Sequence, residues 1–314
     1  MKECHPLWVW IDPTRRCNLK CRLCYTKDGQ GAEDLSLPIL RSIVDRLMSE
    51  PRIEIRQITF NWRGEPTLNK ELPALLSELR HRRAGFPIEF HTNATAINDR
   101  TAHRIVDACG EGFTVCVSID GGTQASHDAQ RGRGTFHRAI RGARALLSAR
   151  GGRAWPRIVL HQLDLRVSHA AYDDEFLNLS REVDLWQRKV PIVPGGERRL
   201  FGSEPLTEAG TSLVDQWQAV AMPWGIPTGA CFWAGNSLSI APNGDVYICL
   251  LSSTPGGVLG NLLVDPVWTL VEKSRRWRER LEVDGRHDTA HCATCRMENG
   301  SVSTQWANGN VVAA

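Results

Sequence analysis

The sequence predicts an α/β fold: a partial (β/α)6 barrel followed by a small domain that is built from a β-hairpin and a helix. Strand-like apolar runs alternate with amphipathic helical segments through the first two-thirds of the chain, which is typical of βαβ units and a parallel sheet. Six repeats are too few to close a standard eight-stranded barrel. In the last third the pattern changes, and Asn243-Gly244 between two alternating runs indicates a hairpin.

The expected elements follow in chain order. The strands of the barrel are short apolar runs bounded by turns, at 7–11, 53–60, 87–91, 113–119, 157–167 and 190–193. The helices carry their apolar residues on one face, at 37–47 with Ser36 as N-cap, 72–79, 99–109, 136–149 and 173–183. In the last third, 237–240 and 245–249 are the hairpin strands, and 267–281 is a helix. We therefore predict a barrel domain at 1–195, a connector at 196–228 and a C-terminal domain at 229–314.

The composition limits the function classes. With 42% hydrophobic and 23% charged residues, the 314-residue chain has the composition of a folded soluble protein. The net charge of +3 comes without a basic block, so we expect no nucleic-acid partner. No apolar run approaches the roughly 20 residues of a membrane span, and the first residues do not form a secretory signal. We expect a cytoplasmic protein, in which ten cysteines indicate metal binding or catalysis and not disulfides.

Three of these cysteines follow the first strand with the spacing CxxxCxxC, at Cys17, Cys21 and Cys24. Three thiolates on one loop can hold three corners of a cubane iron–sulfur cluster and leave the fourth iron open to a ligand that is not protein. Structural zinc is the alternative, but it takes four protein ligands, and no fourth lies nearby in the sequence. The spacing also differs from that of tetrathiolate ferredoxins. A 4Fe-4S cluster with one open iron is therefore the favoured interpretation.

With aromatic Tyr25 after the last cysteine, this motif resembles that of the radical S-adenosylmethionine (SAM) enzymes. The resemblance continues in Gly64-Glu65-Pro66, which is similar to the family's GGEP motif with Arg63 in place of the first glycine. It implies that the chain binds SAM as co-substrate at the open iron and forms a 5′-deoxyadenosyl radical from it. It also implies an external electron donor of the flavodoxin or ferredoxin type.

Four further residues match cofactor contacts of the family: Asn93, Ser118, Asp120 and Arg131. The resemblance implies that the Glu65 carboxylate accepts hydrogen bonds from the SAM ammonium group and that Arg131 pairs with the SAM carboxylate. Ser118 and Asp120 lie at a spacing of two, on one strand face, which suits the ribose hydroxyls. The alternatives are ordinary turn formation at Gly64-Glu65-Pro66 and capping by Ser118 and Asp120.

The C-terminal cysteines Cys231, Cys249, Cys292 and Cys295 have a spacing that resembles a twitch domain, the short form of the SPASM domain. The resemblance implies a second 4Fe-4S cluster; a zinc knuckle is the alternative. Cys116, in a strand, and Cys109, at a helix end, are expected to be small buried hydrophobic residues.

Within the twitch group, the chain most resembles the radical epimerases of aminoglycoside biosynthesis, which invert one sugar carbon, as in the conversion of neomycin C to neomycin B. In these enzymes the cysteine at the position of Cys249 returns a hydrogen atom to the substrate radical. Two roles for Cys249 stay open. As hydrogen donor, it leaves Cys231, Cys292 and Cys295 to hold the second cluster with an unidentified fourth ligand. As cluster ligand, it favours the alternative function, a radical dehydrogenase of an aminocyclitol alcohol.

The substrate implied by this resemblance is a small, polycationic aminoglycoside. We expect it to approach carboxylates such as Asp12 or Asp164 at the mouth of the barrel. Radical enzymes that modify ribosomal peptides are a rival, and they commonly carry a peptide-binding segment before the cysteine loop. An electron carrier without catalytic function is a further rival, but it would leave the Gly64-Glu65-Pro66 motif without a purpose.

Overall fold

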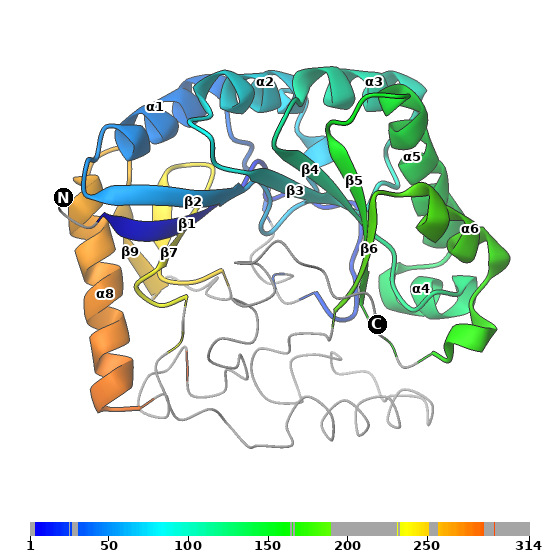
Figure 1. The fold of residues 1–314 in the computed structure, drawn as a ribbon. Helices are drawn as coiled ribbons and strands as arrows, with labels where there is room; N and C mark the ends of the chain where they lie inside the picture. Colours follow the sequence, from blue (N-terminus) through cyan, green and yellow to red (C-terminus); the bar gives the residue numbers. More distant parts are fainter. Residues whose placement is uncertain are drawn as a thin grey trace.

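The computed structural model describes residues 4–24, 26, 31–163, 165, 167–189, 231, 233–250, 257–285 and 292. Its strands form one nine-stranded sheet in the order β6-β5-β4-β3-β2-β1-β7-β8-β9. The sheet is curved, and the helices α1, α2, α3, α5 and α6 cover its convex side (Figure 1). No helix of these residues is long and apolar enough to cross a membrane.

The first six strands are parallel and alternate with helices, as the sequence predicts. The strands are β1 (His5–Ile11), β2 (Ile53–Thr59), β3 (Ile88–Thr92), β4 (Phe113–Ser118), β5 (Arg157–Leu163) and β6 (Leu185–Lys189). The helices are α1 (Leu37–Met48), α2 (Leu72–Arg82), α3 (Asp99–Ala108), α4 (Gln124–Arg131), α5 (Thr135–Arg150) and α6 (Asp174–Glu182), with short 3-10 turns η2 (Pro66–Leu68) and η3 (His169–Ala171). The α/β class with a partial parallel barrel is confirmed.

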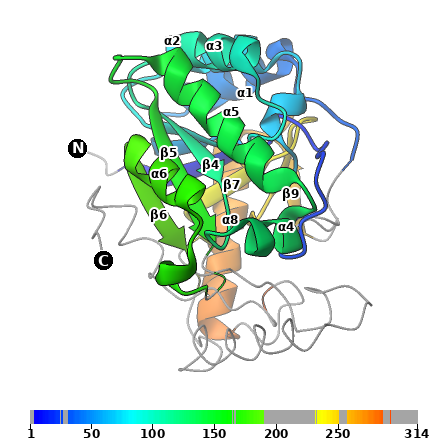
Figure 2. The ribbon, with the colours of Figure 1, turned by 90° about the vertical axis from the view of Figure 1, so that its right-hand side faces the viewer.

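The C-terminal hairpin extends the same sheet. β7 (Ser237–Ile240) pairs in parallel with β1, and β8 (Asp245–Tyr247) returns antiparallel to β7, with the turn at Asn243-Gly244. β9 (Val258–Asn261) pairs antiparallel with β8, and α8 (Val267–Val283) packs against β7 and β9. Viewed from the side of β6 and α6, α8 lies behind them at the far end of the sheet (Figure 2). The pairing of β7 with β1 therefore brings C-terminal residues to the side of the barrel's first strand.

The two faces of the sheet differ in polarity. Leu7, Val9 and Ile11 of β1 point into the main apolar core that the helices cover. Trp8 and Trp10 alternate with them and pack against Trp233, with ring centroids 6.3 and 4.8 Å apart. The concave face is therefore the one on which side chains are left for binding and chemistry.

Several local predictions need correction. The sequence analysis missed α4, which begins with a capping box of Thr123 and Ser126, and it also missed β9. The sixth strand is Leu185–Lys189 and begins earlier than the predicted 190–193, which lies outside the described residues, as does the connector. Ser36 occupies the N-cap position of α1, but its side chain makes no capping hydrogen bond.

Candidate functional site

The loop that carries Cys17, Cys21 and Cys24 is fixed by neighbours far away in the sequence. The backbone N–H groups of Arg22 and Leu23 donate to the carbonyl and side-chain oxygens of Gln130, at 2.8 and 3.2 Å. On another side, the Asn18 amide donates to the Thr95 hydroxyl at 2.9 Å. Helix α4 and the segment after β3 therefore hold the cysteine loop in place.

Gly64 explains why the loop after β2 needs a glycine. A Cβ atom on Gly64 would lie 2.0 Å from the Thr14 carbonyl oxygen and 2.6 Å from that of Arg16. The next residue, Glu65, donates its N–H to the same Arg16 carbonyl at 2.8 Å. Any side chain at position 64 would push this loop away from the backbone just before Cys17.

The three N-terminal thiols are partly exposed and close enough to influence one another. Burial raises the pKa of the Cys17 thiol to about 12, and the Glu65 carboxylate and the other two sulfurs add to this. Burial also raises the pKa of Cys21, against the attraction of the Arg131 guanidinium. Metal ligation must replace these thiol protons, so cluster assembly releases protons here. Three neighbouring sulfur ligands on a fixed loop fit a cluster with one open iron.

The Glu65 carboxylate is buried and accepts hydrogen bonds from both sides of the site. Its Oε1 accepts from the N–H and hydroxyl of Thr67, at 3.2 and 2.7 Å, and from the Thr92 hydroxyl at 2.6 Å. Its Oε2 accepts from the N–H of Asn93 at 2.7 Å. Burial raises the pKa of Glu65, while these donors act in the opposite direction. Glu65 thus joins the turn after β2 to the end of β3.

Asn93 extends this network to the cysteine loop. Its side-chain amide donates to the Asn18 oxygen at 2.9 Å, and its own oxygen accepts from the N–H and hydroxyl of Thr95. Pro66, the next residue of the motif, is buried at the start of η2. The predicted residues Gly64, Glu65, Pro66 and Asn93 are therefore close together beside the cysteine loop.

Asp120 and Arg131 are paired with each other. Arg131 Nε and Nη2 donate to the two carboxylate oxygens of Asp120, at 2.6 and 3.2 Å, and the N–H of Leu163 donates to Asp120 Oδ1 at 3.1 Å. Burial lowers the pKa of Arg131, but the Asp120 carboxylate and the Cys21 sulfur more than offset this and raise it overall. Arg131 therefore keeps its charge, and the hydrogen-bonded pair lies next to the cysteine loop.

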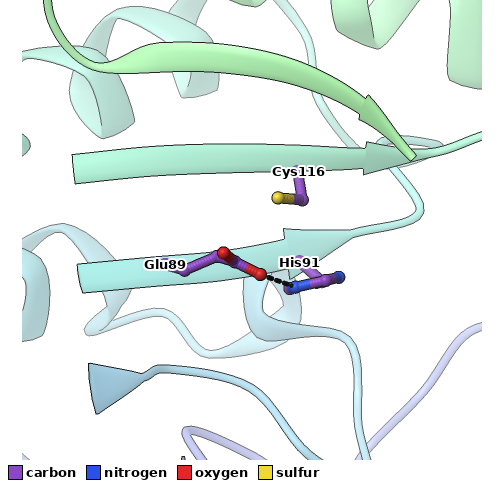
Figure 3. A group of neighbouring side chains, drawn as sticks. All are labelled: Glu89, His91 and Cys116. Carbon is purple, nitrogen blue, oxygen red and sulfur yellow. Dashed lines mark hydrogen bonds and ion pairs between the residues drawn. The ribbon is translucent and has the colours of Figure 1, made fainter. Parts of the chain in front are cut away.

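Further polar side chains lie on the concave face of strands β3 and β4. Ser118 ends β4 beside His161 of β5 and is partly exposed. Glu89, His91 and Cys116 have their ligand atoms within 4.8 Å of one another, and His91 is hydrogen-bonded to Glu89 (Figure 3). Cys116 is buried, as predicted, but lies beside these polar groups, whereas Cys109 is part of the main apolar core. Sequence analysis gave Glu89 and His91 no role.

Asp12 is not free for a substrate, contrary to our expectation. Its carboxylate and the Arg63 guanidinium are both fully buried and form an ion pair, with Nε 2.9 Å from Oδ2. Burial raises the pKa of Asp12 to about 6, and the charge and hydrogen bonds of Arg63 oppose that rise. The Arg63 guanidinium also stacks on Trp62, with Cζ 3.9 Å from the ring centroid, and lies 5.1 Å from the centroid of Tyr247.

Cys249 lies two residues beyond β8 and is partly exposed. It packs with Trp10 against a small apolar cluster formed by Trp62, Ala241, Tyr247 and Leu250. The Trp62 indole N–H donates to the Leu250 carbonyl. The loop that carries Arg63 and Gly64 is therefore in direct contact with the segment that carries Cys249, although nearly 190 residues separate them.

Three predicted residues lie outside the described part of the chain, namely Tyr25, Cys295 and Asp164. Cys231 and Cys292 are described and are partly exposed. The six cysteines assigned to clusters and Cys249 fall into two sequence segments, and both segments can now be compared with known proteins.

Residues 11–162 match the model of the radical SAM superfamily, and residues 231–296 match that of SPASM, an iron–sulfur cluster-binding domain. The chain contains a radical SAM domain and a SPASM domain. The six cysteines assigned to clusters, and Cys249, lie within the two matched segments. These two domains imply SAM and iron–sulfur clusters as the cofactors of this chain.

Individual proteins agree with this assignment. The mycofactocin maturase MftC of Mycobacterium ulcerans (strain Agy99) is 26% identical over 327 residues, which cover 93% of this chain and 82% of that protein. The structure of native anSMEcpe with bound AdoMet has a TM-score of 0.63 at 18% identity and covers 93% of this chain and 88% of that one. Streptococcus suis SuiB bound to its precursor peptide SuiA has a TM-score of 0.59 at 14% identity, covering 93% and 70%. These two structures share the fold of this chain.

Sequence reasoning missed the residues that hold the site together. Gln130 fixes the cysteine loop from α4, a helix that was itself not predicted. The capping pattern Thr123-x-x-Ser126 was the signal that could have revealed this helix. The Asp12–Arg63 pair had no local signal, because its partners lie 51 residues apart.

Proposed function

We propose that this enzyme inverts one sugar carbon of an aminoglycoside, as in the conversion of neomycin C to neomycin B. The observation that carries the proposal is the contact between the Cys249 segment and the loop of the Gly64-Glu65-Pro66 motif. A thiol beside the cofactor motif is well placed to return a hydrogen atom to a substrate radical. The concave face below it is lined with hydrogen-bonding groups such as Glu89 and His91, which suit a substrate rich in amines and hydroxyls.

In this proposal, Cys17, Cys21 and Cys24 hold the cluster with the open iron. Cys231, Cys292 and Cys295 hold the second cluster. The residues proposed for SAM binding are Tyr25, Gly64, Glu65, Pro66, Asn93, Ser118, Asp120 and Arg131. Hydrogen bonds within the chain support two of these roles: Glu65 joins the loops of the proposed SAM site through four hydrogen bonds, and Asp120 is paired with Arg131.

The chemistry supplied by the bound cofactors is removal of a hydrogen atom from a substrate C–H bond by a 5′-deoxyadenosyl radical. Cys249 then gives its S–H hydrogen atom to the opposite face of the planar carbon radical, which forms the inverted C–H bond. The S–H bond is weaker than the C–H bond formed, so this transfer is favourable. The sulfur radical left on Cys249 takes one electron from an external flavodoxin or ferredoxin and one proton from solvent. Each turnover thus consumes one SAM and two electrons.

The test uses anaerobic, cluster-reconstituted enzyme with reductant, SAM and neomycin C in deuterated water. We expect neomycin B that carries one solvent deuterium at the inverted carbon. The Cys249→Ala variant should still form 5′-deoxyadenosine but no neomycin B, with iron content equal to wild type. Cys4→Ala, at an exposed cysteine, is the matched control and should behave as wild type. A ketone product, or loss of iron from Cys249→Ala, would support the dehydrogenase and the ligand role of Cys249 instead.

A second candidate is the maturation of a peptide, favoured by the similarity to a mycofactocin maturase over 93% of the chain. Its distinguishing outcome is neomycin C that remains unchanged and does not stimulate 5′-deoxyadenosine formation above the substrate-free rate.

A further inference from the structure

Within the described part of the chain, Arg63 and Ser239 are among the side chains with buried polar atoms that have no hydrogen-bond partner: Nη1 and Nη2 of Arg63, and Oγ of Ser239. Arg63 uses only Nε and its backbone N–H to contact Asp12. Both side chains are buried. Burying a donor without an acceptor costs free energy, and a guanidinium group has five N–H bonds to satisfy.

These unpaired atoms lie around one aromatic residue. Ser239 is the strand partner of Tyr247 on one side and of Trp10 on the other. The Arg63 guanidinium lies 5.1 Å from the Tyr247 ring centroid. Tyr247 and Trp10 are both in contact with the cluster of side chains to which Cys249 belongs. Donors from two distant parts of the chain therefore flank the segment that carries the proposed hydrogen donor.

Arg63 is also a departure of this chain from the GGEP motif, where glycine stands at this position. The Arg63 Nε is paired with Asp12, and the guanidinium plane lies over the ring of Trp62. These two contacts fix Nη1 and Nη2 in one orientation. A fixed guanidinium fork with two unused nitrogens is typical of a group that binds an oxygen-bearing ligand.

We propose that Arg63 and Ser239 form a subsite that binds a neutral oxygen of the substrate, a hydroxyl or a carbonyl, next to the reacting carbon. Charge decides between a neutral oxygen and a carboxylate. The guanidinium charge is already matched by buried Asp12, so a carboxylate would add a second buried anion to a single cation. The inference rests on the proposed function for the identity of the substrate and deepens it by naming the group that orients the substrate toward Cys249.

The two serines of β7 provide a matched test, because both are fully buried on the same face of one strand. Ser237 Oγ donates to the Trp233 carbonyl at 2.9 Å, whereas Ser239 Oγ has no partner among the residues that the structure describes. For Ser239→Ala, we expect the Tm of the reconstituted enzyme to stay unchanged or rise, and the KM for neomycin C to rise at least fivefold. For Ser237→Ala, we expect the Tm to fall and the KM to stay within twofold of wild type.

Arg63→Lys is the second variant, because lysine keeps the charge that pairs with Asp12 but has no fork. We expect the KM for neomycin C to rise at least tenfold. The Kd for SAM, measured without substrate, should change by less than twofold, and the iron content should stay that of wild type. Weaker SAM binding or loss of iron in Arg63→Lys would show that Arg63 serves the cofactors, and this would overturn the inference.

The serine comparison also separates this inference from the proposed function. If wild-type enzyme does not invert neomycin C, the aminoglycoside proposal fails, but the Tm values need no substrate. An unchanged or higher Tm for Ser239→Ala together with a lower Tm for Ser237→Ala still supports a Ser239 hydroxyl that is kept for a ligand. Equal losses of Tm would show that the Ser239 hydroxyl serves the fold, and the subsite would be rejected.

Discussion

The two sides of the concave face differ in how completely their buried polar groups are hydrogen-bonded. On the side of β3, β4 and α4, the Glu65 carboxylate accepts four hydrogen bonds, and Asp120 accepts from Arg131 and from the Leu163 backbone. On the side of β1, β7 and β8, Arg63 and Ser239 are also buried, but Nη1 and Nη2 of Arg63 and Oγ of Ser239 have no partner in the described part of the chain. On the first side the two carboxylates are fully paired and, of the network residues named here, only His127 keeps a buried nitrogen, Nε2, without a partner among the described residues, whereas on the second side two nitrogens of Arg63 and the Ser239 hydroxyl are left over.

This difference corresponds to two different tasks. SAM and its cluster need a site whose geometry is set before binding, and saturated hydrogen bonds provide such rigidity. A substrate that must be oriented toward a thiol needs donors that the fold has not used. Removing a bonded group on the first side should therefore reduce stability and cofactor binding together, whereas changing the unpaired groups of Arg63 and Ser239 should change substrate binding alone.

The largest effect is expected from Gly64→Ala, because at this position the loop after β2 lies closest to the backbone of Thr14 and Arg16. The new Cβ would meet the Thr14 carbonyl oxygen at 2.0 Å, and no side-chain rotation can relieve a backbone contact. We expect the free energy of unfolding to fall by more than about 3 kcal/mol, with loss of iron at the N-terminal cluster and of 5′-deoxyadenosine formation. Gly152→Ala, where no atom lies within 4 Å, is the control and should keep both. Normal iron loading in Gly64→Ala would contradict this account.

Glu65→Gln tests whether stability and SAM binding depend on the four hydrogen bonds that the Glu65 carboxylate accepts. The amide nitrogen would face either the Asn93 N–H or the hydrogen-bond donors of Thr67 and Thr92, so that two donors oppose each other. We expect a loss of about 2 to 3 kcal/mol in the free energy of unfolding, together with a Kd for SAM raised at least tenfold. Glu71→Gln, at an exposed glutamate that accepts from Leu37 N–H, should stay within about 0.5 kcal/mol of wild type. Equal effects of the two substitutions would mean that saturation at Glu65 has no special value.

The sequence was sufficient for the barrel because each strand there is a local apolar run that ends at a turn or helix. The runs near Leu7, Phe90 and Val115 became β1, β3 and β4 with boundaries shifted by only a few residues. The sequence analysis did not predict helix α4, because its only buried residues are His127 and Gln130 and it therefore has no apolar face. The pairing of β7 with β1 is a tertiary contact that no local pattern encodes.

For the site, the cysteine spacing and the Gly64-Glu65-Pro66 motif were visible because each is contiguous in the sequence. The partners of these motifs were not, because they come together only through the fold. Asp12 reads as a free carboxylate in the sequence, and only the structure reveals that Arg63 neutralises it. Likewise, the hydroxyl that Ser239 leaves unpaired cannot be distinguished from the bonded hydroxyl of Ser237 by sequence alone.

The smallest predicted effect concerns pH and again belongs to the first side. His127 of α4 accepts a hydrogen bond from the Asp120 N–H at 3.1 Å, and burial lowers its pKa to about 4. In the unfolded chain its pKa is that of ordinary histidine, about 6.5, so between these values the unfolded state binds the additional proton. The stability from neutral His127 is therefore complete above about pH 6.5 and is lost as the pH falls toward 4. We expect a loss of about 2 kcal/mol between pH 7 and pH 5.

Urea unfolding of metal-free, reduced protein across this range measures the slope directly. His127→Gln keeps an oxygen that can accept from the Asp120 N–H but does not titrate, so its unfolding free energy should depend less on pH between 7 and 5. His103→Gln, at an exposed histidine of α3 outside the network, is the control and should leave the slope as in wild type. If His127→Gln retains the full slope, the acid sensitivity arises elsewhere. In that case, stability would not depend on keeping the His127 imidazole neutral to accept the hydrogen bond from the Asp120 N–H.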